Sequence, residues 1–347
     1  MKFALSSGFF SLYKLRNGVA FGPKQLAMLK AAGIDRIEVL LGPRPAFGLA
    51  HHGHVHYDDP AEIALVVNSA RALGVEIYSV HAPWNFCYPR QEFLSILQSD
   101  GIDPVTALRL ADEENIDKWD LTHPQNHAGI EAVKGLVDVT AMMGAQMVVA
   151  HIDEFHNANQ EERENLYQNL SSVLPYFEER SIRLGLENIY PSAIDFVKSL
   201  PFKNVGFVLC THHTLTRVGH PGYMIYPPTE SLVEAIHACG DRLIHLHLNE
   251  VFSAETCDFQ AITPYEQGRD KEAILNSDGG MAAHFIPYDF DSGLDWSALL
   301  KALRDVAFEG VYLFEPDGIL PEYQEEKLAF VKAGFERMAQ ETAILYT

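Results

Sequence analysis

The chain has 347 residues, of which 47% are hydrophobic, and this is enough apolar material for a large core. Its formal net charge is −21, from 47 acidic and 26 basic residues, and such a surface repels phosphate backbones, so nucleic-acid binding is disfavoured. Four cysteines without a CxxC pair are too sparse for a disulfide framework. These sparse cysteines favour a reducing cytoplasm, and no apolar run approaches the length of a membrane span.

In the first half of the chain, short apolar runs alternate with helical patterns. Pro23 is suited to the first turn of a helix, and Gly33, Gly74 and Gly144 follow helical stretches as stop signals. The expected strands cover residues 3–7, 34–41, 75–81 and 146–151, and the expected helices cover 23–32, 60–73 and 127–143.

The same alternation continues through the second half. Leu166, Leu170, Val173 and Phe177 recur at helical spacing and predict an amphipathic helix there. The expected strands cover residues 182–187, 205–210, 243–248 and 311–315, and the expected helices cover 160–180, 192–199, 229–239, 295–306 and 321–338.

Eight strand and helix alternations in one series predict a single (β/α)₈ TIM barrel, forming one domain over residues 1–347. The strands are continuous apolar runs, as in a parallel sheet covered on both faces. A doubly wound sheet is the alternative, but the segment SSGFFS after the first strand has no GxGxxG motif. The connections 82–126 and 249–294 are long, and we expect them to form insertions after strands three and seven.

Two glutamates, Glu187 and Glu315, close apolar strands, where an unpaired carboxylate is costly. A metal ion, a basic partner or a raised pKa must stabilise each of them. The carboxyl ends of the strands of a TIM barrel meet at one end of the barrel, so we expect both glutamates in one site. Carboxylates there bind divalent metals or move protons at a substrate carbon, which predicts a catalytic role for both.

Histidines close three further strands. In the run IHLHLNE, His245 and His247 face the same side, and His247 lies nearer the strand end, so it is the better ligand, whereas His245 is expected deeper inside the barrel. His81 and His151 end strands three and four. Each is either a hydrogen-bonded core residue or a contact to substrate or metal.

Three more residues near the strand ends are ambiguous. Cys210 is either a small buried hydrophobe or, when deprotonated beside a metal, a zinc ligand. His213 lies just beyond the same strand and is placed to reach a substrate. Trp84 provides either an apolar wall for a sugar ring or ordinary packing.

Several motifs occur in the order typical of one superfamily: VHAPW at strand three, the histidine ending strand four, GLEN at strand five, HLNE at strand seven, and the later SGLDW and FEGVYLFE. By these motifs the chain resembles the xylose isomerase-like TIM-barrel superfamily. That superfamily contains sugar isomerases and epimerases, inosose and dehydroshikimate dehydratases, and endonuclease IV.

The resemblance implies a divalent metal ion, Zn²⁺, Mn²⁺, Co²⁺ or Mg²⁺, held by Glu187, residue 210, His247 and Glu315. Family members usually carry aspartate at the position of Cys210, in a pattern like DTGH, where this chain reads CTHH. A thiolate there favours zinc; otherwise the substitution indicates a weakened or lost metal site.

The resemblance also extends to substrate contacts. His213 matches the histidine of the DTGH pattern, and His284 matches a histidine ahead of the GxGxxDW-like segment, although the spacing here is longer. The expected substrate-binding residues are His81, Trp84, His151, His213 and His284.

The leading hypothesis is a metal-dependent isomerase or epimerase that transfers a proton at carbon through an enediolate of a sugar, keto-sugar or polyol. A lyase or dehydratase shares the proton-abstraction step and stays open. An endonuclease IV-like phosphodiesterase and a non-catalytic sugar-binding barrel are further alternatives. The expected partner is a small sugar or polyol, with no nucleic acid or membrane, and a homo-oligomer is possible.

Overall fold

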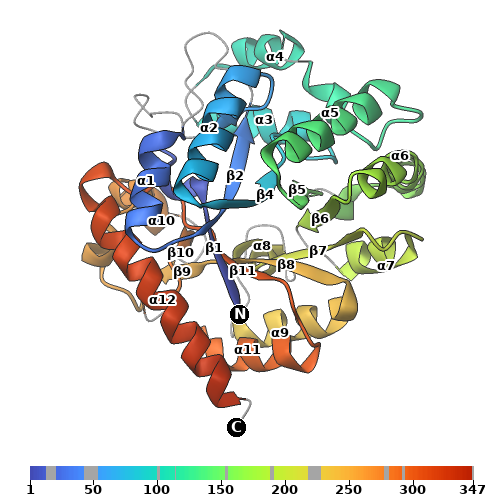
Figure 1. The fold of residues 1–347 in the computed structure, drawn as a ribbon. Coiled ribbons are helices and arrows are strands. Elements are labelled where there is room, and N and C mark those ends of the chain that lie inside the picture. Colours follow the sequence, from blue (N-terminus) through green and yellow to red (C-terminus); the bar gives the residue numbers. More distant parts are fainter. Residues whose placement is uncertain are drawn as a thin grey trace.

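The computed structural model describes residues 1–12, 21–42, 54–99, 102–113, 115–152, 155–187, 191–217, 228–276, 281–290 and 294–345. Eight parallel strands form a closed barrel surrounded by helices (Figure 1), which confirms the predicted (β/α)₈ fold. The barrel closes because β1 pairs with both β11 and β2. The barrel strands are β1 (Lys2–Ser6), β2 (Arg36–Gly42), β4 (Glu76–His81), β5 (Met147–His151), β6 (Arg183–Glu187), β7 (Val205–Cys210), β8 (Leu243–Leu248) and β11 (Val311–Phe314).

The helices begin and end close to the sequence signals. Asn126 caps α5 through its side chain, and Asn159 forms a capping box with Glu162 at the start of α6. Gly74 and Gly144 end α2 and α5 with positive φ angles of 64° and 71°. The helices are α1 (Pro23–Ala31), α2 (Pro60–Leu73), α3 (Pro89–Ser99), α4 (Pro104–Glu113), α5 (His127–Met143), α6 (Gln160–Glu179), α7 (Pro191–Ser199), α8 (Thr211–Arg217), α9 (Pro228–Cys239), α10 (Lys271–Asn276), α11 (Trp296–Asp305) and α12 (Gln324–Leu345).

The two connections expected to be long contain structure of their own. Between β4 and β5, the helices α3 and α4 precede α5, which matches the helix expected over residues 127–143. Between β8 and β11, β9 (Glu250–Ser253) and β10 (Met281–Phe285) form an antiparallel pair. The sequence did not predict that pair, and it carries His284 to the carboxyl end of the barrel. A further two-residue strand, β3 (Val55–His56), extends the sheet beside β2.

The barrel interior changes character along its axis. A compact apolar cluster packs inside the barrel, and polar residues close several strands at their carboxyl ends. The apolar cluster comprises Ala4, Tyr78, Met147, Val149, Val208, Val311 and Leu313. This packed floor places the polar groups at one open end, hereafter the mouth. Within the described ranges, no helix is both long enough and apolar enough to cross a bilayer.

Candidate active site at the barrel mouth

The polar residues that end the barrel strands lie together at the mouth. His151 pairs in register with Glu187, and Cys210 pairs with His247, so neighbouring strands present their terminal side chains side by side. Glu315 follows β11 directly. The strand ends therefore bring together residues that lie more than two hundred positions apart in the sequence.

Four of these residues form a compact group, hereafter the four-residue centre: His81, Glu187, His247 and Glu315. One potential ligand atom from each lies within 4.8 Å of the others. His247 Nδ1 is 3.1 Å from Glu187 Oε2 and 2.9 Å from Glu315 Oε1, and His81 Nε2 is 3.4 Å from Glu187 Oε2. The side chains of Glu187 and His247 are fully buried.

The charged groups of the centre shift one another's pKa values. Burial raises the pKa of Glu187, but His247 and His151 bring it well below the ordinary value. Burial likewise raises the pKa of Glu315, and His247 brings it below its ordinary value. Burial lowers the pKa of His247, but Glu187 and Glu315 raise it well above 6.5. The two carboxylates are thus ionised, and without a metal ion the protonated ring of His247 supplies the positive charge between them.

The centre fits a divalent metal ion. Neither carboxylate oxygen of Glu187 accepts a hydrogen bond from the described residues, although both are buried. Two carboxylates and two imidazoles supply the oxygen and nitrogen ligands that Zn²⁺, Mn²⁺ and Co²⁺ accept. Buried carboxylate oxygens without donors and aimed at imidazole nitrogens are the arrangement that a bound cation satisfies.

Cys210 lies beside the four-residue centre. Its Sγ is 3.8 Å from Glu315 Oε2, and Asn249 Nδ2 donates both to that sulfur at 3.5 Å and to Glu315 Oε2 at 3.2 Å. Burial, together with Glu187 and Glu315, raises the pKa of the thiol well above its ordinary value. Without a metal ion, Cys210 is therefore a neutral thiol that donates to Glu315, and its role as a ligand stays a prediction.

Glu38 is a buried acidic residue near the site that the sequence analysis missed. It lies in the middle of β2, is fully buried, and contacts His247 Nε2 at 3.2 Å. His245 Nε2 lies 3.5 Å away, deeper in the barrel, as the alternation of IHLHLNE predicts. Burial raises the pKa of Glu38, but His247 and His245 bring it far below its ordinary value. A single charged residue inside the apolar run IEVLLG was the available signal.

Histidines also line the rim above the centre. His151 Nε2 is 3.1 Å from His81 Nε2 and 3.3 Å from Glu187, and His213 Nε2 is 3.9 Å from Glu187. His212, His213 and His284 form a further group with potential ligand atoms within 4.8 Å of one another. The sequence therefore predicted three rim histidines that the fold brings together, and His212 joins them.

His284 reaches the rim through an irregular backbone. It adopts a positive φ of 65° where the pairing of β9 and β10 shifts register. Its Nδ1 lies 3.5 Å from Asp317 and 3.7 Å from Glu315. Burial, with a contribution from Glu315, raises the pKa of Asp317 to about 6 although His284 opposes that rise. Trp84, the fifth predicted substrate contact, is buried edge-on against Phe93, and its substrate role stays a prediction.

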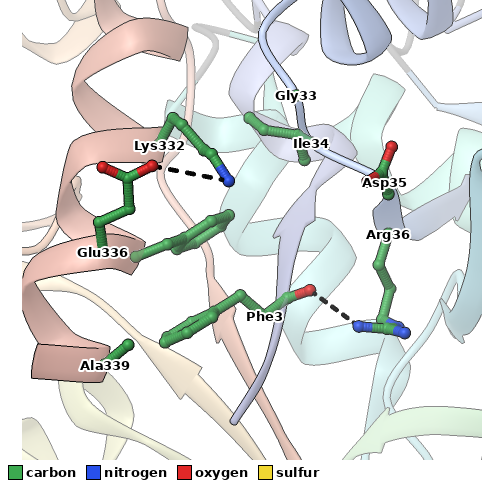
Figure 2. Close-up of a pocket in the computed structure, with 9 residues that line it drawn as sticks. Phe3, Gly33, Ile34, Asp35, Arg36, Lys332, Glu336 and Ala339 are labelled. Atoms are coloured by element: carbon green, nitrogen blue, oxygen red, sulfur yellow. Dashed lines mark hydrogen bonds and ion pairs between the residues drawn. The ribbon is translucent and has the colours of Figure 1, made fainter.

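A groove of about 250 Å³ opens at the other end of the barrel, where the amino ends of β1 and β2 meet α12 (Figure 2). Its charged side chains form ordinary surface ion pairs. Arg36 lies 2.7 Å from Glu76, and Lys332 lies 3.8 Å from Glu336. Since this end of a TIM barrel supports stability, the mouth is the candidate active site.

The family model described as "Xylose isomerase-like TIM barrel" matches residues 26–334. The chain belongs to this family. Among curated proteins, the uncharacterized protein y4fM of Sinorhizobium fredii is 25% identical over 272 residues, covering 74% of this chain and 71% of that protein.

Solved structures similar to this chain include two sugar epimerases and a zinc-bound protein. D-psicose 3-epimerase from Clostridium cellulolyticum H10 with D-tagatose has a TM-score of 0.61 and 14% identity, covering 97% of this chain and 98% of that one. The IolI protein with a bound zinc atom has a TM-score of 0.56 and 16% identity, covering 100% of both chains. The 3-keto-D-glucoside 4-epimerase from E. coli has a TM-score of 0.54 and 13% identity, covering 96% and 99%. At these identities the likeness shows the shared fold.

Proposed function

We propose that this protein is a metal-dependent isomerase or epimerase that acts on a small sugar, keto-sugar or polyol. The observation that carries the proposal is the four-residue centre, in which two ionised, buried carboxylates and two imidazoles converge. The fold shared with D-psicose 3-epimerase and 3-keto-D-glucoside 4-epimerase supports a sugar substrate. The surface charge of −21 also favours a small substrate over a nucleic acid.

Glu187, His247 and Glu315 would hold the ion, with His81 or Cys210 as the fourth ligand. When bound, a divalent ion supplies Lewis acidity, which polarises a carbonyl and stabilises negative charge on substrate oxygens. A neutral Cys210 leaves a ligand set of oxygen and nitrogen, whereas a deprotonated Cys210 favours zinc. The identity of the ion therefore depends on the protonation of this one thiol.

The protein groups would move the proton. Burial raises the pKa values of Glu187 and Glu315, but His247 lowers them by more, so both carboxylates are ionised at neutral pH. Either carboxylate can therefore accept a proton from carbon and return it. His81 at the centre and the rim residues His151, His213 and His284 present ring nitrogens at the mouth, where they would bind substrate hydroxyl groups. Trp84 would supply an apolar wall.

The test is solvent deuterium incorporation into a panel of keto-sugars and keto-inositols, measured for the wild type, Glu187→Gln and Glu315→Gln. We expect exchange in the wild type and its loss in both variants. The exposed Glu326→Gln provides a matched control and should exchange normally. Exchange retained by both active-site variants would overturn the assignment, and a product that has lost water would identify a lyase instead.

A metal-dependent phosphodiesterase of the endonuclease IV kind is a second candidate, and one observation favours it. The group of His151, Glu187 and His213 shares Glu187 with the four-residue centre. The group of His212, His213 and His284 in turn shares His213 with that second group. Such contiguous groups are suited to more than one ion. About three metal ions per chain and cleavage of abasic DNA would support this candidate, whereas one ion and sugar turnover would exclude it.

A further inference from the structure

Glu38 carries no role in the proposed proton transfer, yet it is fully buried beneath the centre. A carboxylate placed inside a barrel is costly unless its oxygens are satisfied. Ser79 Oγ, on the neighbouring strand β4, donates a hydrogen bond to Glu38 Oε2 at 2.7 Å. This bond and the backbone pairing of Glu38 with Ser79 fix where the carboxylate lies.

The two nitrogens of His247 face different groups. Its Nε2 lies 3.2 Å from Glu38 Oε1 and 3.4 Å from Glu38 Oε2. Its Nδ1, on the other side of the ring, lies 3.1 Å from Glu187 Oε2 and 2.9 Å from Glu315 Oε1. The ring therefore stands between a buried carboxylate below and the four-residue centre above.

The chemistry of imidazole makes this arrangement directional. A neutral imidazole carries one N–H and one lone pair, and an ionised carboxylate can only accept. A proton on Nε2 therefore satisfies Glu38 and leaves the lone pair of Nδ1 directed at the centre. A carboxylate behind a metal-bound histidine fixes the ring orientation and strengthens the ligand nitrogen.

We propose that Glu38 is a positioning residue that holds the Nε2 proton of His247 and thereby makes Nδ1 the metal-ligating atom. The proposal rests on the proposed function for the presence of a metal at the four-residue centre. Ser79 keeps the carboxylate in place, and complete burial leaves Glu38 no water to turn towards.

Glu38 could instead be a ligand, since it also forms a group with His245 and His247 whose potential ligand atoms lie within 4.8 Å of one another. Positioning explains more of the geometry, because Ser79 already occupies one Glu38 oxygen and His247 Nδ1 faces two further carboxylates. A second ion between Glu38 and His245 would overturn the positioning role.

The test compares Zn²⁺ affinity, by competition with a chromogenic chelator, for the wild type, Glu38→Met and Glu38→Gln. Loss of the carboxylate that accepts from the second nitrogen of a metal-bound histidine weakens metal affinity about 10–100-fold. We expect a loss of this size in Glu38→Met. Glu38→Gln keeps an oxygen that accepts from Nε2–H but lacks the charge, so it should recover part of the affinity. It also preserves size, so the comparison holds if the methionine variant fails to fold.

Asn169→Ala is the matched control. Asn169 is a buried polar side chain on α6 that belongs to none of the groups able to hold a metal ion, and it donates to the carbonyls of Leu121 and His123. The control should lower the melting temperature and leave zinc affinity unchanged. Equal zinc affinity in the wild type and both Glu38 variants would overturn the proposal.

Nitrogen-edited NMR of the zinc-loaded protein gives a readout independent of activity. In the wild type, the His247 signal, assigned from its absence in His247→Gln, should show a protonated Nε2 and an unprotonated Nδ1. A protonated Nδ1 would overturn the positioning role even in an active enzyme. A different result would separate the two proposals. If the NMR signals and the zinc affinities are as expected but the wild type exchanges no sugar proton, Glu38 remains the positioning residue and the isomerase function is rejected.

Discussion

The two ends of the barrel use the same kinds of charged residue in opposite ways. At the amino end, the ion pair of Arg36 and Glu76 lies at the surface, where both side chains keep contact with water. Lys332 and Glu336 form a further surface pair beside the same groove (Figure 2). At the mouth, Glu187 and His247 are fully buried, and neither oxygen of Glu187 accepts a hydrogen bond within the described part of the chain. Burial, rather than charge itself, distinguishes the mouth from the amino end.

This difference has an energetic consequence. A surface ion pair contributes about 0–1 kcal/mol, whereas removal of one partner from a buried pair costs about 3–5 kcal/mol because an uncompensated charge remains. The mouth should therefore respond strongly to any change in its cation, and the groove should respond weakly. Each prediction below tests one part of that contrast, from the largest expected effect to the smallest.

His247→Ala should have the largest effect on stability. The substitution leaves Glu38, Glu187 and Glu315 facing one another without the imidazole between them. We expect the free energy of unfolding of the metal-free protein to fall by about 3–5 kcal/mol at neutral pH. Urea unfolding would measure it. Wild-type stability in this variant would show that the mouth charges are already compensated, and the comparison between the two ends would fail.

A metal ion bound at the mouth should stabilise the folded wild type. Zn²⁺ at about 100 times its Kd adds about 2.7 kcal/mol to the free energy of unfolding, since it binds the folded state alone. Thermal unfolding with zinc and then with a chelator would measure the gain and its reversal. Glu187→Gln should show little gain. An equal gain in that variant would place the ion elsewhere.

The pH dependence of the metal-free protein should be set by the same groups. Burial lowers the pKa of His247, but Glu187, Glu315 and Glu38 raise it well above 6.5, so its contribution to stability is fully present below pH 6.5 and is lost as pH rises through the raised value. The lowered pKa values of Glu187 and Glu315 contribute stability above pH 4.5 that is lost as pH falls.

The contribution of the centre is therefore greatest between about pH 4.5 and 6.5 and declines at higher pH. Urea unfolding of the metal-free protein at pH 5.5, 7.5 and 9 would measure the decline, and His247→Gln should reduce it. Zinc affinity should change in the opposite sense, rising with pH, because the ion replaces the proton of His247. A wild-type profile that matches His247→Gln would contradict the assignment.

The parts of the fold that depend on local signals were predictable from the sequence. Strand and helix alternation gave the barrel, and Gly74 and Gly144 marked the ends of α2 and α5. The strand ends at Glu187 and His247 were recognisable because a polar residue closed an apolar run. These signals act over a few residues, and the closed barrel then determines which strand ends meet.

The parts that the sequence did not predict depend on contacts between distant segments. Glu38 stands in the middle of a strand, so only the partners from β4 and β8, Ser79 and His247, reveal its place beneath the site. The antiparallel pairing of β9 with β10 has no local turn signal, because about 27 residues separate the two strands. The rim position of His212 likewise depends on α8, a short helix directly after β7.

Cys210→Asp should change which ion the mouth prefers. A carboxylate beside Glu315 replaces a neutral thiol with an oxygen ligand, and oxygen ligands suit Mn²⁺ and Mg²⁺ better than sulfur does. We expect the ratio of Zn²⁺ to Mn²⁺ affinity to fall, measured by metal competition on the metal-free protein. Cys210→Ser, of similar size and neutral, is the control. An unchanged ratio would show that residue 210 stays outside the ligand set.

The smallest effect is expected at the groove. Arg36→Ala removes the ion pair with Glu76 and a hydrogen bond to the carbonyl of Phe3, both at a surface that water reaches. We expect the free energy of unfolding to fall by about 1 kcal/mol or less, with zinc affinity and sugar exchange unchanged. Arg36→Lys should fall between this variant and the wild type. Loss of zinc affinity or sugar exchange in Arg36→Ala, under conditions where the variant remains folded, would mean that the amino end also serves function. Burial would then no longer distinguish the two ends.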